Sequence, residues 1–245
     1  PNHLHGTFAK KVYKGSIVDG GLVLRAVSPD GEDGFPGNLE LTVRYTLTDE
    51  NALVLDYTAT TDAPTIINLT NHSYFNLEGQ SSGSMLEQTL CLNASTFTEG
   101  NAETCPTGRI LPVAGTPMDF TRAKPIGRDI QAEYSQLQMC GGYDHNFILD
   151  KEPGMLALAA VARSEKTGIT METYTTQPGV QLYTSNSLQN DTRPGKTGGI
   201  YGRYQGFCLE TQHYPCTPSH PEFPSVELRP GEEYHETTIY KFLTE

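Results

Sequence analysis

The chain of 245 residues is poor in basic side chains. Lys and Arg together number 17 against 29 Asp and Glu, which gives a formal net charge of −12. An acidic chain repels phosphate backbones and anionic membrane surfaces, so we expect no nucleic-acid partner and no membrane-surface role. No apolar run approaches the roughly 20 residues of a membrane-spanning helix. No signal peptide is visible at the start of the sequence.

Cysteine is also scarce, and the cysteines follow no disulfide or metal pattern. There are five, an odd number, and none forms a C-x-x-C motif. This usage favours free thiols in a reducing compartment over a disulfide framework, so we expect a cytoplasmic protein. The five are Cys91, Cys105, Cys140, Cys208 and Cys216.

Helical periodicity is nearly absent, and strand periodicity takes its place. Apolar and polar residues alternate in residues 39–47, 52–60, 168–176 and 234–242, as in strands with one buried and one wet face. Residues 155–162 are almost wholly apolar and follow a glycine, and we interpret them as a buried strand. One short helix is predicted, at residues 126–134.

Frequent turn signals separate these predicted strands. Pro-Gly pairs occur at residues 36–37, 153–154, 194–195 and 230–231. Many short strands with almost no helix predict an all-β sandwich or barrel. Without a linker, repeat or low-complexity tract, residues 1–245 are expected to form a single domain. In such folds, function resides in loops and strand ends on one face.

Two polar stretches contain the side chains best suited to acid–base chemistry. His72 lies in the sequence NLTNHSYFNL (residues 68–77), just after an apolar segment, residues 64–70, that we expect as a strand. Glu210 lies in GFCLETQ (residues 206–212). A histidine and a carboxylate suffice to move one proton onto a substrate and another off it. A structural histidine and an outward-facing glutamate are equally compatible with the sequence alone.

Other polar residues are less informative by themselves. Asp144, in GYDHNF, has the context of a turn residue, and Gln181 follows a Pro-Gly turn. His3 and His5 form an H-x-H pair, which with Glu210 and His213 would resemble a metal-ligand set. The spacing is unspecific, and we expect no metal site.

Together, five stretches carry a resemblance that covers nearly the whole chain. They are NHLHG (residues 2–6), NLTNHSYFNL, GYDHNF, TTQPGVQLY (residues 175–183) and GFCLETQ. In this order they resemble the galactose mutarotase, or aldose 1-epimerase, family. The resemblance implies a large antiparallel β-sandwich with a hexose, galactose or glucose, in a cleft on one face. By the same resemblance, Glu210 is the catalytic base and His72 the acid, His5, Asp144 and Gln181 hold the sugar, and no cofactor is needed.

Family members usually carry a further stretch of strands before the first motif, with an Asn-Arg pair that contacts the sugar. The present sequence begins after that point. The resemblance therefore predicts a sheet that lacks its first strands. It also predicts that residues 1–245 alone are a weaker catalyst than a version with the upstream stretch.

The implied reaction interconverts α and β anomers through the open aldehyde. Glu210, ionised, would take the O1 proton while His72, protonated, gives one to the ring oxygen. Three alternatives remain: a non-catalytic carbohydrate-binding β-sandwich, a hexose-6-phosphate 1-epimerase, and a metal enzyme that uses His3 and His5. The phosphate-specific alternative needs an Arg or Lys cluster, and the five stretches contain none.

Overall fold

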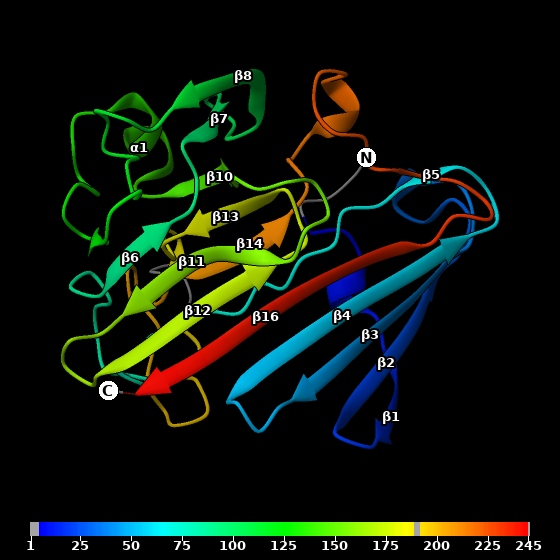
Figure 1. Ribbon diagram of the computed structural model, residues 1–245, viewed down its shortest axis with the longest axis horizontal. Helices are drawn as coiled ribbons and strands as arrows, with labels where there is room; N and C mark the ends of the chain where they lie inside the picture. The colour runs from blue at the N-terminus through cyan, green and yellow to red at the C-terminus, as the bar shows by residue number, and fades with distance from the viewer. Residues whose placement is uncertain (1–4, 189–191, 245) are drawn as a thin grey trace.

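Two antiparallel sheets pack face to face in the computed structural model, which describes residues 5–188 and 192–244 (Figure 1). The larger has nine strands in the order β1-β2-β3-β4-β16-β12-β11-β6-β9, and the smaller has five in the order β14-β13-β10-β7-β8. β15 and β5 form a separate pair. The strands are β1 (Lys14–Val18), β2 (Gly21–Ser28), β3 (Leu39–Leu47), β4 (Ala52–Thr61), β5 (Thr65–Ile66), β6 (Thr89–Leu92), β7 (Thr96–Gly100), β8 (Pro106–Pro112), β9 (Lys124–Pro125), β10 (Asp144–Ile148), β11 (Ala157–Arg163), β12 (Ile169–Thr175), β13 (Gly179–Tyr183), β14 (Cys208–Gln212), β15 (Glu227–Leu228) and β16 (Tyr234–Thr244). The helix α1 spans Ser135–Cys140, and short 3-10 segments occupy Phe8–Lys10, Glu32–Gly34 and Thr217–Ser219.

The alternating segments of the sequence form the long strands of the larger sheet. β3 coincides with the predicted residues 39–47, and β4, β12 and β16 match their predictions to within two residues. Leu39, Leu41 and Val43 are buried while Glu40 is exposed, which is the pattern of a strand with one face on the core. The apolar segment at residues 155–162 forms β11, so its interpretation as a strand is confirmed.

The prediction of a helix at residues 126–134 is wrong. These residues follow a series of turns, and α1 begins only at Ser135. The Gly127 amide bonds to the Leu86 carbonyl, and a Cβ atom at Gly127 would lie only 2.6 Å from the Leu86 Cβ. Buried Lys124 also donates to Asp129 at 2.7 Å. Tertiary contacts of this backbone thus replace the hydrogen bonds of a helix.

The core lies between the two sheets, and hydrogen bonds between β16 and β14 cross it. Apolar side chains of both sheets join one buried cluster that includes Leu55, Phe97 and Leu182. The Tyr240 hydroxyl on β16 donates to the Leu209 carbonyl on β14 at 2.9 Å. Residues 209 and 211 of β14 therefore face the core, which leaves residues 208 and 210 on the opposite, outer face of the small sheet.

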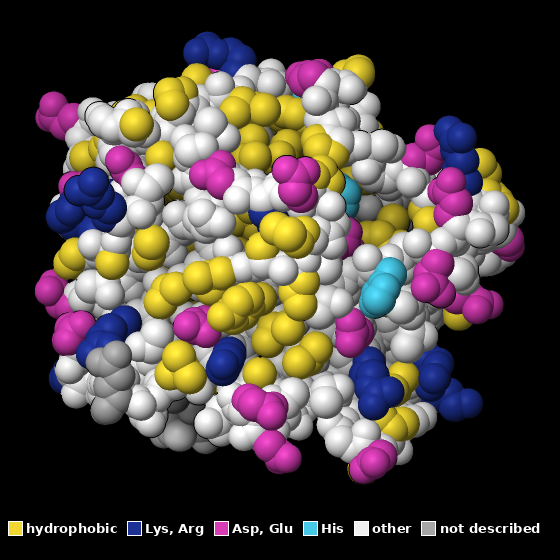
Figure 2. Space-filling view, in the orientation of Figure 1, with side chains coloured by type: hydrophobic (Ala, Val, Ile, Leu, Met, Phe, Trp, Pro, Cys, Tyr) yellow, Lys and Arg dark blue, Asp and Glu magenta, His cyan; other side chains and the backbone are white. Residues whose placement is uncertain are grey.

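The surface agrees with the charge of the sequence. Acidic side chains are spread over the face shown in Figure 2, among patches of hydrophobic side chains. Within residues 5–188 and 192–244, no helix combines the length and apolar character needed to cross a membrane.

Candidate active site

The outer face of the small sheet carries the polar residues singled out in the sequence. In the strand register, Asp144, Tyr183 and Cys208 stand side by side on β10, β13 and β14. The next row consists of Asn146, Gln181 and Glu210. Gln181 and Glu210 therefore lie inside strands, where the sequence predicted loops or strand ends, whereas Asp144 is the first residue of β10. Their opposite neighbours fill the core, which fixes the strands and the direction of the polar side chains.

A second segment, residues 68–75, brings His72 to this face. The strand expected at residues 64–70 is shorter, because β5 ends at Ile66 and the Ile67 amide bonds to the Val226 carbonyl. Further along, Phe75 and Phe207 form an antiparallel bridge with N–O distances of 2.8 and 2.9 Å. His72 lies three residues before Phe75, and Glu210 lies three residues after Phe207. An antiparallel bridge pairs residues that are displaced equally in opposite directions, so it places the two side chains opposite each other.

His72 and Glu210 do face each other. The His72 Nε2 lies 3.5 Å from the Glu210 Oε1. The imidazole stacks on the Tyr74 ring, with centroids 5.1 Å apart and planes 22° from parallel. His5 approaches edge-on from the other side, at 5.2 Å between centroids. The His72 Nδ1 is buried without a hydrogen-bond partner among residues 5–188 and 192–244, so a substrate or water group can still bind there.

Burial sets the protonation of this pair. Glu210 is only 6% exposed, and burial, with the nearby Asp144 charge, raises its pKa to about 8. Burial and the neighbouring His5 lower the pKa of His72. Both shifts favour the uncharged forms, which is opposite to the ionised Glu210 and protonated His72 that the reaction scheme requires.

Asp144 and Gln181 form the adjoining part of the site. The Gln181 Nε2 donates to the Asp144 Oδ1 at 2.8 Å, while the buried Gln181 Oε1 has no partner in the part of the chain that the structure describes. Burial raises the pKa of Asp144, and the Gln181 hydrogen bond partly offsets this rise. Asn146 in the same row is also buried with both amide atoms unpaired. Unsatisfied buried polar atoms are costly, and those of Gln181 and Asn146 lie side by side in this row.

The site adjoins two cavities. A cavity of about 720 Å³ is lined by residues that include His5, His72, Tyr45 and Tyr214. A smaller one of about 20 Å³ is lined by residues that include Asp144 and Gln181. Glu210 lines neither, but it lies within 3.5 Å of His72 and beside Gln181 in the sheet. His72 thus faces the larger cavity, and Asp144 and Gln181 face the smaller one.

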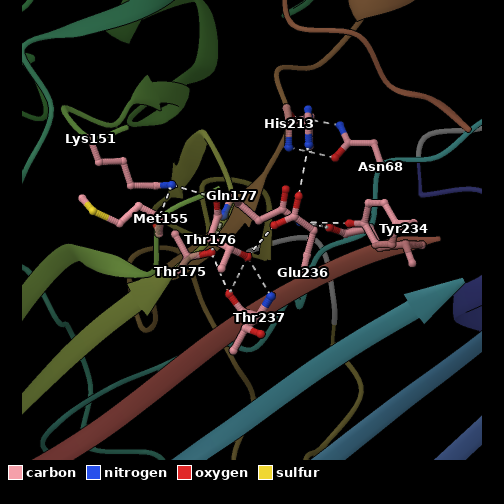
Figure 3. Close-up of polar contacts among 11 residues, drawn as sticks. Asn68, Lys151, Met155, Thr175, Thr176, Gln177, His213, Tyr234, Glu236 and Thr237 are labelled. Atoms are coloured by element: carbon pink, nitrogen blue, oxygen red, sulfur yellow. Dashed lines mark hydrogen bonds and ion pairs between the residues drawn. The ribbon is translucent and has the colours of Figure 1, made fainter. Parts of the chain in front are cut away.

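A polar network behind the pair holds its two backbones in place (Figure 3). The Asn68 side chain donates to the His213 carbonyl at 2.9 Å and accepts from the His213 amide at 3.0 Å. Gln177 donates to the Leu69 carbonyl at 3.2 Å, and Glu236 on β16 lies 3.4 Å from the His213 ring. Asn68 thus links the segment that leads to His72 with the segment that follows Glu210. His213 belongs to this network, so it is not part of the metal-ligand set considered from sequence.

Within the described residues, one group of donor atoms is compact enough to hold a metal ion. Single ligand atoms of His72, Cys208 and Glu210 all lie within 4.8 Å of one another. Sequence reasoning missed Cys208, although the period of two in Cys208-Leu-Glu210 places it on the face of Glu210. Tyr74, which is stacked on His72, was also missed. His3 lies outside the described residues, and His5 contacts His72 as described above.

Fold and site together define a β-sandwich whose small sheet has a polar face with an opposed histidine and glutamate, an arrangement suited to a carbohydrate-active enzyme. The aldose 1-epimerase family model matches residues 1–241. Galactose mutarotase of Rattus norvegicus is 42% identical over 245 residues, which are 99% of this chain and 69% of that protein. Aldose 1-epimerase of Escherichia coli strain K12 is 38% identical over 250 residues, which are 100% of this chain and 71% of that protein.

Solved structures agree with these matches. The GalM/aldose epimerase homologue of C. elegans superimposes with a TM-score of 0.83 at 30% identity, covering 95% of this chain and 68% of that one. Galactose 1-epimerase of Lactobacillus acidophilus NCFM gives 0.79 at 30% identity, over 95% and 66% of the two chains. The chain belongs to the aldose 1-epimerase family.

Proposed function

We propose that this aldose 1-epimerase interconverts the α and β anomers of galactose or glucose, with Glu210 and His72 as the proton-transfer pair. The observation that carries the assignment of residues is the opposition of the two side chains at 3.5 Å, on the polar face of the small sheet. Ring opening must remove a proton from O1 and add one to O5. These oxygens share one carbon, so an adjacent base and acid can act on them together.

The pKa shifts define how the pair works. At pH values between the lowered pKa of His72 and the Glu210 pKa of about 8, the pair without bound sugar holds one exchangeable proton, mostly on Glu210. For the ring of the bound sugar to open, that proton must be on His72 and Glu210 must be a carboxylate. Sugar hydroxyls that donate to the carboxylate favour this form. The open aldehyde leaves the pair in the resting arrangement, and reversal of both transfers closes the ring on the other face after rotation about C1–C2.

The remaining polar residues orient the sugar. His5, Asp144 and the unpaired Gln181 oxygen offer acceptors and donors on both sides of the pair. Among the described residues that line the two cavities, Lys11 is ion-paired with Glu32 at 2.6 Å. A basic cluster for a phosphate is not present in that lining, which supports a neutral hexose over a hexose 6-phosphate.

Polarimetry on freshly dissolved α-galactose and α-glucose tests the proposal. We expect the protein to speed the approach to anomeric equilibrium for at least one of these sugars, and His72→Asn to remove most of that effect. Sugar binding without any acceleration by the intact protein would identify a carbohydrate-binding module instead. Full activity of His72→Asn would leave the enzyme but refute the role of His72.

A further inference from the structure

Two cysteines that are far apart in sequence meet at the rim of the site. Cys105 directly precedes β8, and Cys216 lies in the loop between β14 and the 3-10 segment Thr217–Ser219. The Cys105 side chain lies near enough to that of Cys216 to raise the pKa of the Cys216 thiol. Both residues are exposed and neither is in a disulfide, so a small reagent can reach both thiols.

Contacts that do not involve the sulfur atoms also bring the two segments together. The His220 Nε2 donates to the carbonyl of Pro106, the neighbour of Cys105, at 2.9 Å. A Cβ atom at Gly108 would lie only 2.9 Å from the His220 Nδ1, which shows how closely β8 approaches this loop. Thr104, Pro106 and Pro215 line the same small cavity.

The backbone on each side of the pair is also fixed. Asn101 accepts from the Cys105 amide through its side chain at 3.0 Å, and its own amide donates to the Cys105 carbonyl at 2.8 Å. The Cys216 carbonyl accepts from the Ser219 amide at 2.9 Å. A bond between the sulfurs would therefore join two positions that the fold already holds side by side, which is the geometric condition for a disulfide.

We propose that Cys105 and Cys216 form a reversible disulfide that ties β8 to the loop after β14, at the edge of the sugar site. A small-molecule disulfide such as glutathione disulfide is the oxidant. The Cys105 thiolate attacks one of its sulfurs and releases one thiol. The Cys216 thiolate then attacks the Cys105 sulfur of the mixed disulfide and releases the second thiol. The two cysteine protons finish on the released thiols, and the oxidant is reduced by two electrons.

The other cysteines are poor competitors for the oxidant. Burial raises the pKa of the Cys140 thiol to about 12, raises that of Cys91, and raises that of fully buried Cys208 further. Burial and the neighbouring Cys105 raise the pKa of Cys216 to about 11. Cys216 therefore suits the second, intramolecular step, in which the high local concentration of the mixed disulfide compensates for a small thiolate fraction.

The experiment incubates the whole protein with glutathione disulfide at pH 8, beside a dithiothreitol control. Intact mass and peptide mapping should show the loss of two hydrogens and a Cys105–Cys216 cross-link. Since the bond closes a loop on the order of 100 residues, Tm should rise by roughly 5–15 °C and return on reduction. Neither readout depends on the proposed catalytic activity.

Two serine variants locate the bond. Cys105→Ser should lose both the cross-link and the Tm shift, while Cys91→Ser, a change outside the pair, should keep them. Glutathione adducts that persist on both Cys105 and Cys216, or a cross-link to another cysteine, would overturn the proposal. A cross-link without a rise in Tm would contradict the fit of the disulfide to the native fold.

Discussion

Replacement of Glu210 by Gln should abolish turnover and, at neutral pH, stabilise the protein. Gln keeps the shape and the uncharged state that burial favours for Glu210, whose pKa is about 8. It cannot take up the O1 proton. General acid–base groups contribute about 10²–10⁴-fold, so we expect kcat to fall by that factor while sugar binding persists.

The stability effect follows from the sign of the pKa shift. The folded protein holds the Glu210 proton more tightly than the unfolded chain, whose carboxyl pKa is 4.5. Wild-type stability is therefore complete below pH 4.5 and declines as pH rises towards 8, by about 1.4 kcal/mol per unit. The Glu210→Gln variant does not undergo this decrease in the free energy of unfolding, which amounts to about 3 kcal/mol at pH 7 and under about 1 kcal/mol at pH 5.

Thermal denaturation at pH 5 and pH 7, together with polarimetry, measures both effects. For a chain of this length, about 3 kcal/mol should raise Tm at pH 7 by roughly 6–12 °C over wild type. Glu133→Gln, which removes an exposed carboxylate, is the matched control and should change neither property. Normal turnover of Glu210→Gln would refute its role as base. A Tm difference that is the same at both pH values would refute the burial argument.

Four further outcomes are expected. His72→Asn should lower kcat by about 10²–10⁴-fold, and the double variant with Glu210→Gln should lose less than the product of the two factors, because both groups act in one step. The profile of kcat/KM against pH should be bell-shaped. It should fall above about pH 8, where Glu210 loses the pair's proton, and below the lowered pKa of His72, where the pair gains a second proton. A profile that is flat from pH 5 to 9 would contradict this. Asn68→Ala removes both hydrogen bonds to the His213 backbone and should lower kcat about tenfold, whereas Asn68→Asp, which keeps the acceptor, should lose less; equal activity of the two variants would deny the network a positioning role. EDTA should leave the mutarotation rate unchanged, because the proton transfers need no metal, and activity lost to EDTA and restored by a metal would reverse this.

The sequence determined the parts of the molecule that rest on local periodicity. Alternation placed β3, β4, β12 and β16 to within two residues, because a period of two is imposed by the strand itself. The polar stretches around His72 and Glu210 also stood out locally, and so did the acidic surface.

Tertiary structure decided how those parts meet. The Phe75–Phe207 bridge, formed between residues far apart in sequence, sets His72 opposite Glu210, and no local pattern predicts such a pairing. Burial shifts the pKa values of both residues against the charges that the reaction scheme requires, because desolvation depends on the surrounding atoms in space. Tertiary contacts also replaced the helix predicted at residues 126–134 with turns. In the same way, only the folded chain brings Cys105 beside Cys216, since an odd set of scattered cysteines contains no information about which two become neighbours.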